Sequence, residues 1–237
     1  MKEKDNQNFR HIGKKLRTIR QQQGLSLREL AARADVSPSL LSKIENEKAN
    51  PSVGSLHSIA DALSLPITHF FPEEESVEQH IKPIAEATAK VVTKNGPQVQ
   101  DPQLSPMEAV TLLSQADLKF SDIPDHPHGP VVRSNARPTI QLRNGVTWSR
   151  LTPGPEEGVE LMEICYEVGA TSGDGLSHHS GREVQLVLEG ELLLELDLER
   201  YLLKAGDSIA YDSTIPHRLV NVGQVPMRAI SLLFNTK

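Results

Sequence analysis

Four side chains between residues 39 and 46 have the chemistry of groups that contact nucleic acid. Ser39, Ser42 and Asn46 are short and polar, and Lys43 is basic. Short polar side chains can approach base edges in a major groove, whereas a lysine can reach either a base or a phosphate. These residue types therefore indicate a DNA-facing helix, if the surrounding elements hold them together on one exposed face.

The neighbouring residues carry the signals of two short helices joined by a tight turn. Gly24 can end a preceding helix in the left-handed conformation. Ser26 and Glu29 have the spacing of a capping box, which starts the first short helix. Ser37 caps the second, and Pro38 occupies its first turn, where a missing N–H has no effect. Two capped helices in this arrangement can place the second one in a major groove.

Apolar residues at helical spacing predict further helices on both sides of this pair. The expected inward-facing residues are Phe9, Ile12, Leu16 and Ile19, then Leu41 and Ile44, then Val53, Leu56, Ile59, Ala60 and Leu63, and finally Ile67, Phe70 and Phe71. A plain helical bundle would show the same caps and stripes. The pattern alone therefore leaves both a DNA-binding domain and a bundle open.

A resemblance to a known family separates these two alternatives. The XRE (lambda-repressor-like, Cro/C1-type) helix-turn-helix domain is similar to the stretch IGKKLRTIRQQQGLSLRELAARADVSPSLLSKIENEKANPSVGSLHSIADALSLPITHFF. The resemblance implies a five-helix domain, with base contacts from Pro38, Ser39 and Lys43 and phosphate contacts from Ser26 to Arg28. The complete set of expected DNA-binding residues is Ser26, Arg28, Ser37, Pro38, Ser39, Ser42, Lys43 and Asn46. Some relatives have longer amides where this sequence has Ser39 and Leu40, so the operator sequence does not follow.

The same resemblance implies an ion pair within the helical region. Arg20 and Glu45 occupy the positions of a family pair that bridges the first and third helices. Two solvated surface charges are the alternative interpretation. We expect the partly buried pair, and we expect Glu47 to lie on the exposed side.

Charge and composition divide the chain into three zones. Residues 1–72 contain 11 Lys and Arg against 7 Asp and Glu, whereas the whole chain has a net charge of −6. A basic head on an acidic body suits a polyanion-binding protein. Residues 73–130 contain seven prolines and an acidic run, which is typical of a linker, with one short helix expected around residues 105–114. We interpret His126 and His128 as linker residues.

From residue 131 onward the sequence consists of short alternating segments. Examples are LMEICYEVG, VQLVLEG, ELLLELDL, DSIAYD and RAISLLF. Short strands at close spacing with turn signals between them indicate an all-β sandwich or barrel. The expected organisation is therefore a helical domain at 1–72, a linker at 73–130 and a β domain at 131–237, a multi-domain α + β protein.

Two motifs in this β region resemble those of the cupins, which are double-sheet jelly-roll barrels. HHSGREVQLVLEGELLLEL is similar to the first motif, with His179, Glu183 and Gly190 at its fixed places. AGDSIAYDSTIPHRLVN is similar to the second, with matches at Gly206, His217 and Asn221. The resemblance implies a barrel whose interior holds His179, Glu183 and His217.

The resemblance leaves two kinds of chemistry open for this interior. Metal-binding cupins have a histidine where this sequence has Ser177, and Asp212 and Thr214 replace a proline and a glycine of the second motif. His179, Glu183 and His217 nevertheless form a 2-His-1-carboxylate set, which suits a divalent metal such as iron or zinc. Without a metal, these residues and Ser177 would line a pocket for a polar effector. No cofactor is therefore required, and a divalent metal is the alternative.

The remaining residues favour ordinary roles. Trp148, Met162 and Tyr166 lie on alternating segments and are expected in the core. The single cysteine, Cys165, is expected to be a buried apolar residue and indicates a reducing compartment. The N-terminus lacks the apolar stretch of a secretion signal, and no run reaches the roughly 18 apolar residues of a membrane helix. We therefore expect a cytoplasmic protein without a membrane partner.

The order of the two domains is similar to that of bacterial one-component regulators. The resemblance implies a homodimeric repressor, not an enzyme, that binds a two-fold operator in double-stranded DNA and responds to a small-molecule effector, a polar metabolite. A second interpretation is a mononuclear non-haem iron enzyme that uses His179, Glu183 and His217. A third is a binding module regulated by protein contact through the linker.

Overall fold

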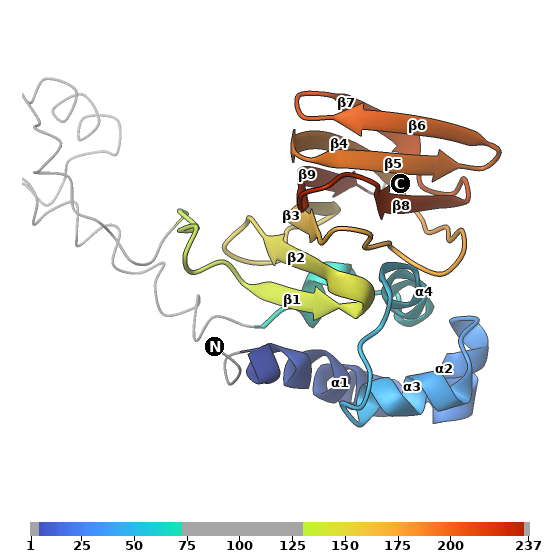
Figure 1. Ribbon diagram of the computed structural model, residues 1–237. Helices are drawn as coiled ribbons and strands as arrows, with labels where there is room; N and C mark the ends of the chain where they lie inside the picture. The colour runs from blue at the N-terminus through green and yellow to red at the C-terminus, as the bar shows by residue number, and fades with distance from the viewer. Residues whose placement is uncertain (1–4, 73–129, 235–237) are drawn as a thin grey trace, which may run out of the picture. The chain divides into compact units, whose positions relative to one another are not determined.

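The computed structural model describes residues 5–72 and 130–234, with side chains from residue 12 onward. The helix expected around residues 105–114, His126 and His128, and the side chain of Phe9 lie outside this part. The first described segment contains four α-helices and one 3-10 helix (Figure 1). They are α1 (Asp5–Gln22), α2 (Leu27–Arg33), α3 (Pro38–Glu45), α4 (Val53–Leu63) and η1 (Ile67–Phe70). The fifth helix of the expected domain is thus the single turn η1.

The helix boundaries follow the signals in the sequence. Gly24 follows α1 with a φ of +69°. The Ser26 hydroxyl accepts from the Glu29 N–H, and the Glu29 carboxylate accepts from the Ser26 N–H, which completes the capping box of α2. The Ser37 hydroxyl accepts from the Leu40 N–H at the start of α3. These local bonds define the ends of the helix-turn-helix.

The second described segment forms two antiparallel sheets. The larger has the order β1-β2-β3-β9-β4-β7, and the smaller has the order β6-β5-β8. The strands are β1 (Thr139–Leu142), β2 (Val146–Arg150), β3 (Val159–Tyr166), β4 (Arg182–Glu189), β5 (Glu191–Leu196), β6 (Glu199–Lys204), β7 (Ser208–Asp212), β8 (His217–Asn221) and β9 (Met227–Phe234), with the 3-10 turn η3 (Arg143–Gly145) between β1 and β2. We call this segment the barrel.

Strand alternation places specific polar residues inside the barrel. On β4 of the larger sheet, Glu183 and Gln185 are buried while their neighbours are more exposed. On β8 of the smaller sheet, His217 and Asn221 are buried on either side of Leu219. Because side chains alternate between the two faces of a strand, both sheets direct these residues into the space between them.

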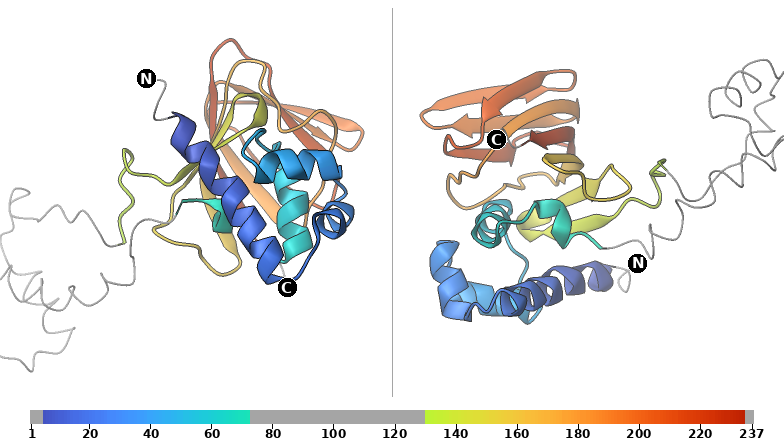
Figure 2. Two further views of the ribbon diagram at one scale, coloured as in Figure 1. Left: turned by 90° about the horizontal axis from the view of Figure 1, so that it is seen from below. Right: turned by 180° about the vertical axis from the view of Figure 1, so that it is seen from behind.

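The helical region packs directly against the barrel. Two views in Figure 2 place α4 and η1 next to the first strands of the barrel. The Ile67 N–H donates to the buried Glu160 carboxylate at 2.8 Å, and the Arg143 N–H donates to the Pro51 carbonyl at 2.9 Å. The Ser180 hydroxyl also donates to Asp61 at 3.3 Å. No helix in the described part of the chain has both the length and the hydropathy that a membrane crossing requires.

Candidate functional site

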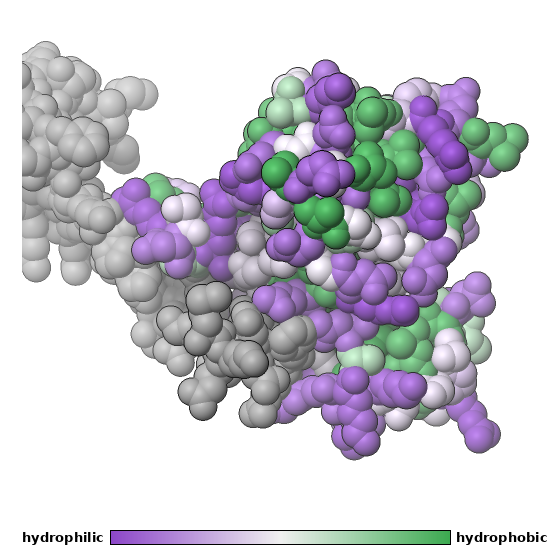
Figure 3. Space-filling view, in the orientation of Figure 1, coloured by the Kyte–Doolittle hydropathy of each residue, from purple (hydrophilic) through white to green (hydrophobic). Residues whose placement is uncertain are grey.

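The outward face of α3 carries the side chains expected to meet DNA. Pro38, Ser39 and Lys43 are exposed, as is Arg28 on α2. In Figure 3, hydrophilic atoms predominate along the margin formed by α1 and α3 in this view. These four residues are therefore free to contact a partner without rearrangement of the helices.

Other residues of the expected DNA-binding set have structural partners. The hydroxyls of Ser26 and Ser37 accept backbone N–H groups as helix caps. The Asn46 amide donates to the Ser42 carbonyl at 2.7 Å. These residues hold the α2 and α3 ends in place, and any DNA contact from them adds to that role.

An ion pair braces α3 against α1. The Arg20 guanidinium donates twice to the Glu45 carboxylate, at 2.5 and 2.8 Å, and also to the Leu25 carbonyl. The Glu45 side chain is only 3% exposed. The buried pair expected from the family resemblance is therefore present, and it fixes α3 relative to the rest of the helical region.

The expected exposure of Glu47 is wrong. Its side chain is 23% exposed and lies 3.9 Å from the Lys14 ammonium. Glu47 follows the end of α3 with a φ of +59°, and its Cγ would lie 3.3 Å from a Cβ atom on Gly13 of α1. Local backbone geometry, which the charge pattern does not encode, causes the difference.

Inside the barrel, His179 and His217 both point toward Glu183. Their Nε2 atoms lie 2.8 and 3.8 Å from the same oxygen, Glu183 Oε1. Each ring is oriented by its Nδ1, which contacts the Ser180 carbonyl in His179 and the Ile215 carbonyl in His217. The convergence expected from the two motifs is thus observed, and Ser177 lines the same space.

Two further polar side chains hold the Glu183 carboxylate. The Tyr211 hydroxyl and the Gln185 amide each donate to Oε2 at 2.6 Å. Both residues are buried. One carboxylate oxygen is therefore held by neutral donors from β4 and β7, while the other faces the two histidines.

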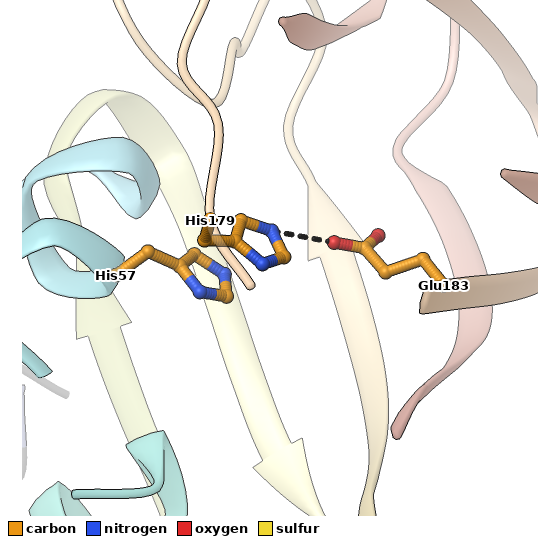
Figure 4. A group of neighbouring side chains, drawn as sticks. All are labelled: His57, His179 and Glu183. Carbon is orange, nitrogen blue, oxygen red and sulfur yellow. Dashed lines mark ion pairs between the residues drawn. The ribbon is translucent and has the colours of Figure 1, made fainter. Parts of the chain in front are cut away.

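A third histidine enters this cluster from the helical region. His57 lies on α4, and its ring stacks on His179 with a centroid distance of 3.5 Å and an angle of 4° between planes (Figure 4). It also meets Trp148 edge-on at 5.6 Å. The candidate site is thus built from both described segments of the chain.

Burial and pairing set the protonation of this cluster. Burial alone would lower the pKa of His179, but its pairing with the Glu183 carboxylate raises that pKa above its ordinary value. Burial favours the neutral acid at Glu183, yet contact with His179 lowers its pKa to about 2. Burial lowers the pKa of His217, and it lowers the pKa of His57 well below the ordinary value. The favoured state is a His179–Glu183 ion pair beside two neutral imidazoles.

The free space at the centre is small. The cavity measures about 20 Å³, and its lining includes Val53 and His57 from α4 as well as Trp148, Glu183 and His217 from the barrel. A water molecule needs roughly 10–15 Å³ on this measure. The cavity therefore has room for one water molecule or one ion, and not for an organic ligand.

Several buried polar atoms around this space have no hydrogen-bond partner within the protein. They are Trp148 Nε1, Tyr166 OH, His179 Nε2 and Gln185 Oε1. The 2.8 Å contact of His179 with Glu183 is thus a close ion pair without good hydrogen-bond alignment. Buried polar groups normally have partners, so these atoms mark a place that suits a polar occupant.

The donor set at Glu183 fits a divalent metal. A metal-bound histidine usually donates its second ring N–H to a carbonyl, which is how Nδ1 is placed in both His179 and His217. His57, His179 and Glu183 have ligand atoms that all lie within 4.8 Å of one another. His217, the third residue of the motif set, has its Nε2 3.8 Å from Glu183 Oε1, so His179 and Glu183 would hold the ion together with a further histidine. When bound, such a metal would supply a Lewis acid with open coordination positions.

Four residues of the site did not emerge from the motifs: His57, Gln185, Tyr211 and Trp148. Trp148 was expected only in the core, where it is indeed buried, together with Met162 and Tyr166, although all three also line the cavity. His57 lies four residues after Val53 and three before Ala60, on the apolar face of α4. A polar histidine among the apolar residues of that face was the only feature of the sequence that could have indicated a role for His57 in the site.

Comparison with known proteins agrees with this architecture. The helix-turn-helix family model matches residues 16–70, and the cupin domain model matches residues 162–233. A solved HTH_3 family transcriptional regulator from Vibrio cholerae has the same fold, with a TM-score of 0.58, 17% identity, and coverage of 98% of this chain and 99% of that one. The fold is therefore that of a helix-turn-helix domain joined to a cupin.

Curated relatives extend over nearly the whole chain. The HTH-type transcriptional regulator PuuR of Escherichia coli is 28% identical over 92% of both chains. SutR, another HTH-type transcriptional regulator of the same species, is 26% identical over 94% of both. The chain therefore carries a helix-turn-helix domain and a C-terminal cupin domain, and the relatives that match it over nearly its whole length are HTH-type transcriptional regulators.

Proposed function

We propose that this regulator is a cytoplasmic homodimeric repressor that binds a two-fold operator in double-stranded DNA. The main support is the outward face of α3, where Pro38, Ser39 and Lys43 are exposed and the Arg20–Glu45 pair fixes the helix from behind. A single small domain reaches few base pairs, so two half-sites are needed for a specific complex. Residues 73–130 would then link a DNA-binding domain at 1–72 to a sensor domain at 131–237.

The barrel offers a surface for the second copy. Exposed apolar side chains lie on β4 of the larger sheet, and on β6 and in the turn between β5 and β6 of the smaller sheet. They are Leu186, Leu188, Leu198, Tyr201 and Leu202. Apolar patches of this kind are typical of protein–protein contacts. Replacement of Leu186 and Leu202 by Asp should convert the dimer to a monomer in light-scattering measurements.

The proposed effector is a small polar metabolite that binds in the barrel. The supporting observation is the group of buried, unpartnered polar atoms around Glu183, which includes Trp148 Nε1 and Gln185 Oε1. An effector changes operator affinity only if it binds the DNA-competent and DNA-incompetent states differently.

In vitro selection from genomic fragments tests DNA recognition directly. We expect the full chain to enrich fragments that share a site with two-fold symmetry. Footprinting should then show protection on two half-sites about 34 Å apart or a multiple of that distance. Binding that is equal on all fragments would contradict the proposal.

A second candidate function is a mononuclear iron enzyme. It is favoured by one observation, the orientation of His179 and His217 with both Nε2 atoms toward Glu183. Elemental analysis of the purified protein, together with operator binding by wild type and His217→Ala, separates the candidates. Close to one iron per chain and oxygen-dependent turnover of a substrate would favour the enzyme. An operator affinity that responds to small polar molecules would favour the sensor.

A further inference from the structure

The helical region contributes part of the wall of the barrel's cavity. Val53 and His57 are four residues apart on α4, so they lie on the same face of the helix. Both line the cavity, and both are buried. The barrel interior is therefore closed by a helix that belongs to the DNA-binding domain.

The position of α4 depends on a close approach of the Gly54 backbone to the Ser177 side chain. A Cβ atom on Gly54 would lie 2.7 Å from the Cβ and Oγ of Ser177. The Gly54 N–H also points to the Ser172 carbonyl at 3.5 Å. Because Gly54 has no side chain, α4 reaches far enough into the barrel for the His57 ring to stack on His179.

The stacked rings have the wrong orientation to share one metal ion. The lone pair of an imidazole nitrogen lies in the ring plane, and these two planes are nearly parallel, with ring centroids 3.5 Å apart. A zinc ion lies 2.0–2.1 Å from each nitrogen along that lone pair. In this arrangement His57 covers His179 instead of joining it as a ligand.

We propose that His57 occupies the place of the effector, so that an organic ligand in the barrel and the docked position of the DNA-binding domain exclude each other. The cavity of about 20 Å³ is much smaller than the roughly 300–1,000 Å³ of an organic ligand site. Removal of His57 from the barrel enlarges that space and uncovers His179. This inference rests on the proposed sensor function.

The chemistry of the uncovered pocket defines the class of ligand. Trp148 Nε1 offers a donor, Gln185 Oε1 offers an acceptor, and Tyr166 OH can act as either. The face of the His179 ring would be open to stacking. A small, flat, polar molecule with both a donor and an acceptor satisfies these groups, and imidazole itself is the simplest probe.

Hydrogen exchange of the full-length protein tests the docking role of His57. The amides of Gly54, Ile67 and Arg143 donate across the contact between the helical region and the barrel. In His57→Ala these amides should exchange about tenfold faster or more, while amides inside α3 and β5 keep their rates. The matched control is His69→Ala, because His69 is exposed on η1. Unchanged exchange at the three interface amides would overturn the proposal.

A titration with imidazole tests the exclusion. Trp148 is the single tryptophan of the chain and lies 5.6 Å from the His57 ring, so its fluorescence reports on the pocket. Imidazole should change this fluorescence in His57→Ala at a concentration at least about tenfold lower than in wild type. Equal responses in the two proteins would contradict closure by His57.

A titration with zinc alone tests the alternative, in which His57 is a metal ligand. Slower exchange of the interface amides with zinc, in wild type but not in His57→Ala, would make His57 a metal ligand and overturn the proposal. DNA binding is a separate measurement. If imidazole binds in the pocket of His57→Ala while the affinity for DNA stays constant, the result supports closure of the pocket by His57 and contradicts the proposed sensor function.

Discussion

The outward residues of α3 lie between positions 38 and 46, whereas the side chains around Glu183 lie between positions 57 and 217. The first group is exposed, and helix caps and one ion pair hold it in place. The second group is buried, and it forms only when two sheets and α4 come together. An exposed surface built from one helix can bind a partner without rearrangement, whereas a pocket closed by another domain is sensitive to how the domains are arranged.

The largest expected effect lies within the helical region. Glu45→Ala leaves the Arg20 guanidinium largely buried without its carboxylate partner. We expect the free energy of unfolding of this region to fall by about 3 kcal/mol, since one-sided loss of a buried pair is costly. Thermal or urea unfolding followed by circular dichroism measures this change.

Glu47→Ala is the comparison variant. It removes only a 3.9 Å contact with Lys14, whose side chain is 74% exposed. The expected loss is below about 1 kcal/mol. Equal losses of unfolding free energy for the two variants would show that the Arg20–Glu45 pair does not brace α3. The DNA-facing surface would then not be held in place by contacts within the helical region alone.

A pH dependence is expected at the contact between the two regions. Burial raises the pKa of Glu160 to about 7, against an ordinary value of 4.5, even though its carboxylate accepts from the Ile67 N–H. The folded protein therefore keeps a proton that the unfolded chain has released. Stability contributed by this group is complete below about pH 4.5 and decreases as the pH rises through 7, by roughly 3 kcal/mol in total.

Glu160→Gln should remove that dependence, because glutamine has nearly the shape of the protonated acid and does not ionise. The melting temperature of the variant should decrease less than that of wild type between pH 5 and pH 8. Glu156→Gln, at an exposed position of the same segment, is the control. Parallel curves for wild type and Glu160→Gln would mean that this contact is not sensitive to pH.

Lys43→Ala tests the exposed surface. If Lys43 contacts phosphate, the variant should bind every DNA sequence more weakly and with a smaller salt dependence. If it contacts a guanine, the loss should be roughly 1–3 kcal/mol and confined to one operator position. Fluorescence anisotropy on selected and mutated sites distinguishes the two results. Unchanged affinity would remove Lys43 from the interface.

A small effect is also expected where Gly54 of α4 meets the barrel. Gly54→Ala adds a Cβ at 2.7 Å from the Ser177 side chain, which should destabilise the docked state by about 1 kcal/mol. Ser177→Gly in the same chain removes the clashing atoms and should restore hydrogen-exchange protection at Ile67 and Arg143. If the double variant shows no more hydrogen-exchange protection at Ile67 and Arg143 than Gly54→Ala does, the contact between Gly54 and Ser177 does not limit docking.

The sequence was most informative where structure is local. Ser26, Glu29 and Ser37 predicted the helix ends, because caps depend on residues three positions apart. The cupin motifs predicted that His179, Glu183 and His217 meet. Strand alternation directs Glu183 on β4 and His217 on β8 inward, whereas His179 lies in the segment just before β4.

The parts that escaped prediction depend on tertiary contacts. His57 has no motif of its own, and its role follows from the packing of α4 against a barrel that begins some 80 residues later. The half-buried position of Glu47 follows from a left-handed backbone at one residue. Tyr211 lies opposite Glu183 on β7, and only the observed register brings these two together, whereas Gln185 lies two residues further along β4 on the same face as Glu183.

The central claim is that the contents of the barrel set the affinity of the helical region for DNA. A parallel titration of small polar molecules into the full-length protein tests it, with Trp148 fluorescence reporting the pocket and anisotropy of a selected operator reporting DNA binding. We predict that each molecule that alters Trp148 fluorescence also alters DNA affinity, with the same midpoint concentration in both signals. A molecule that saturates the pocket signal and leaves DNA affinity unchanged would contradict the claim.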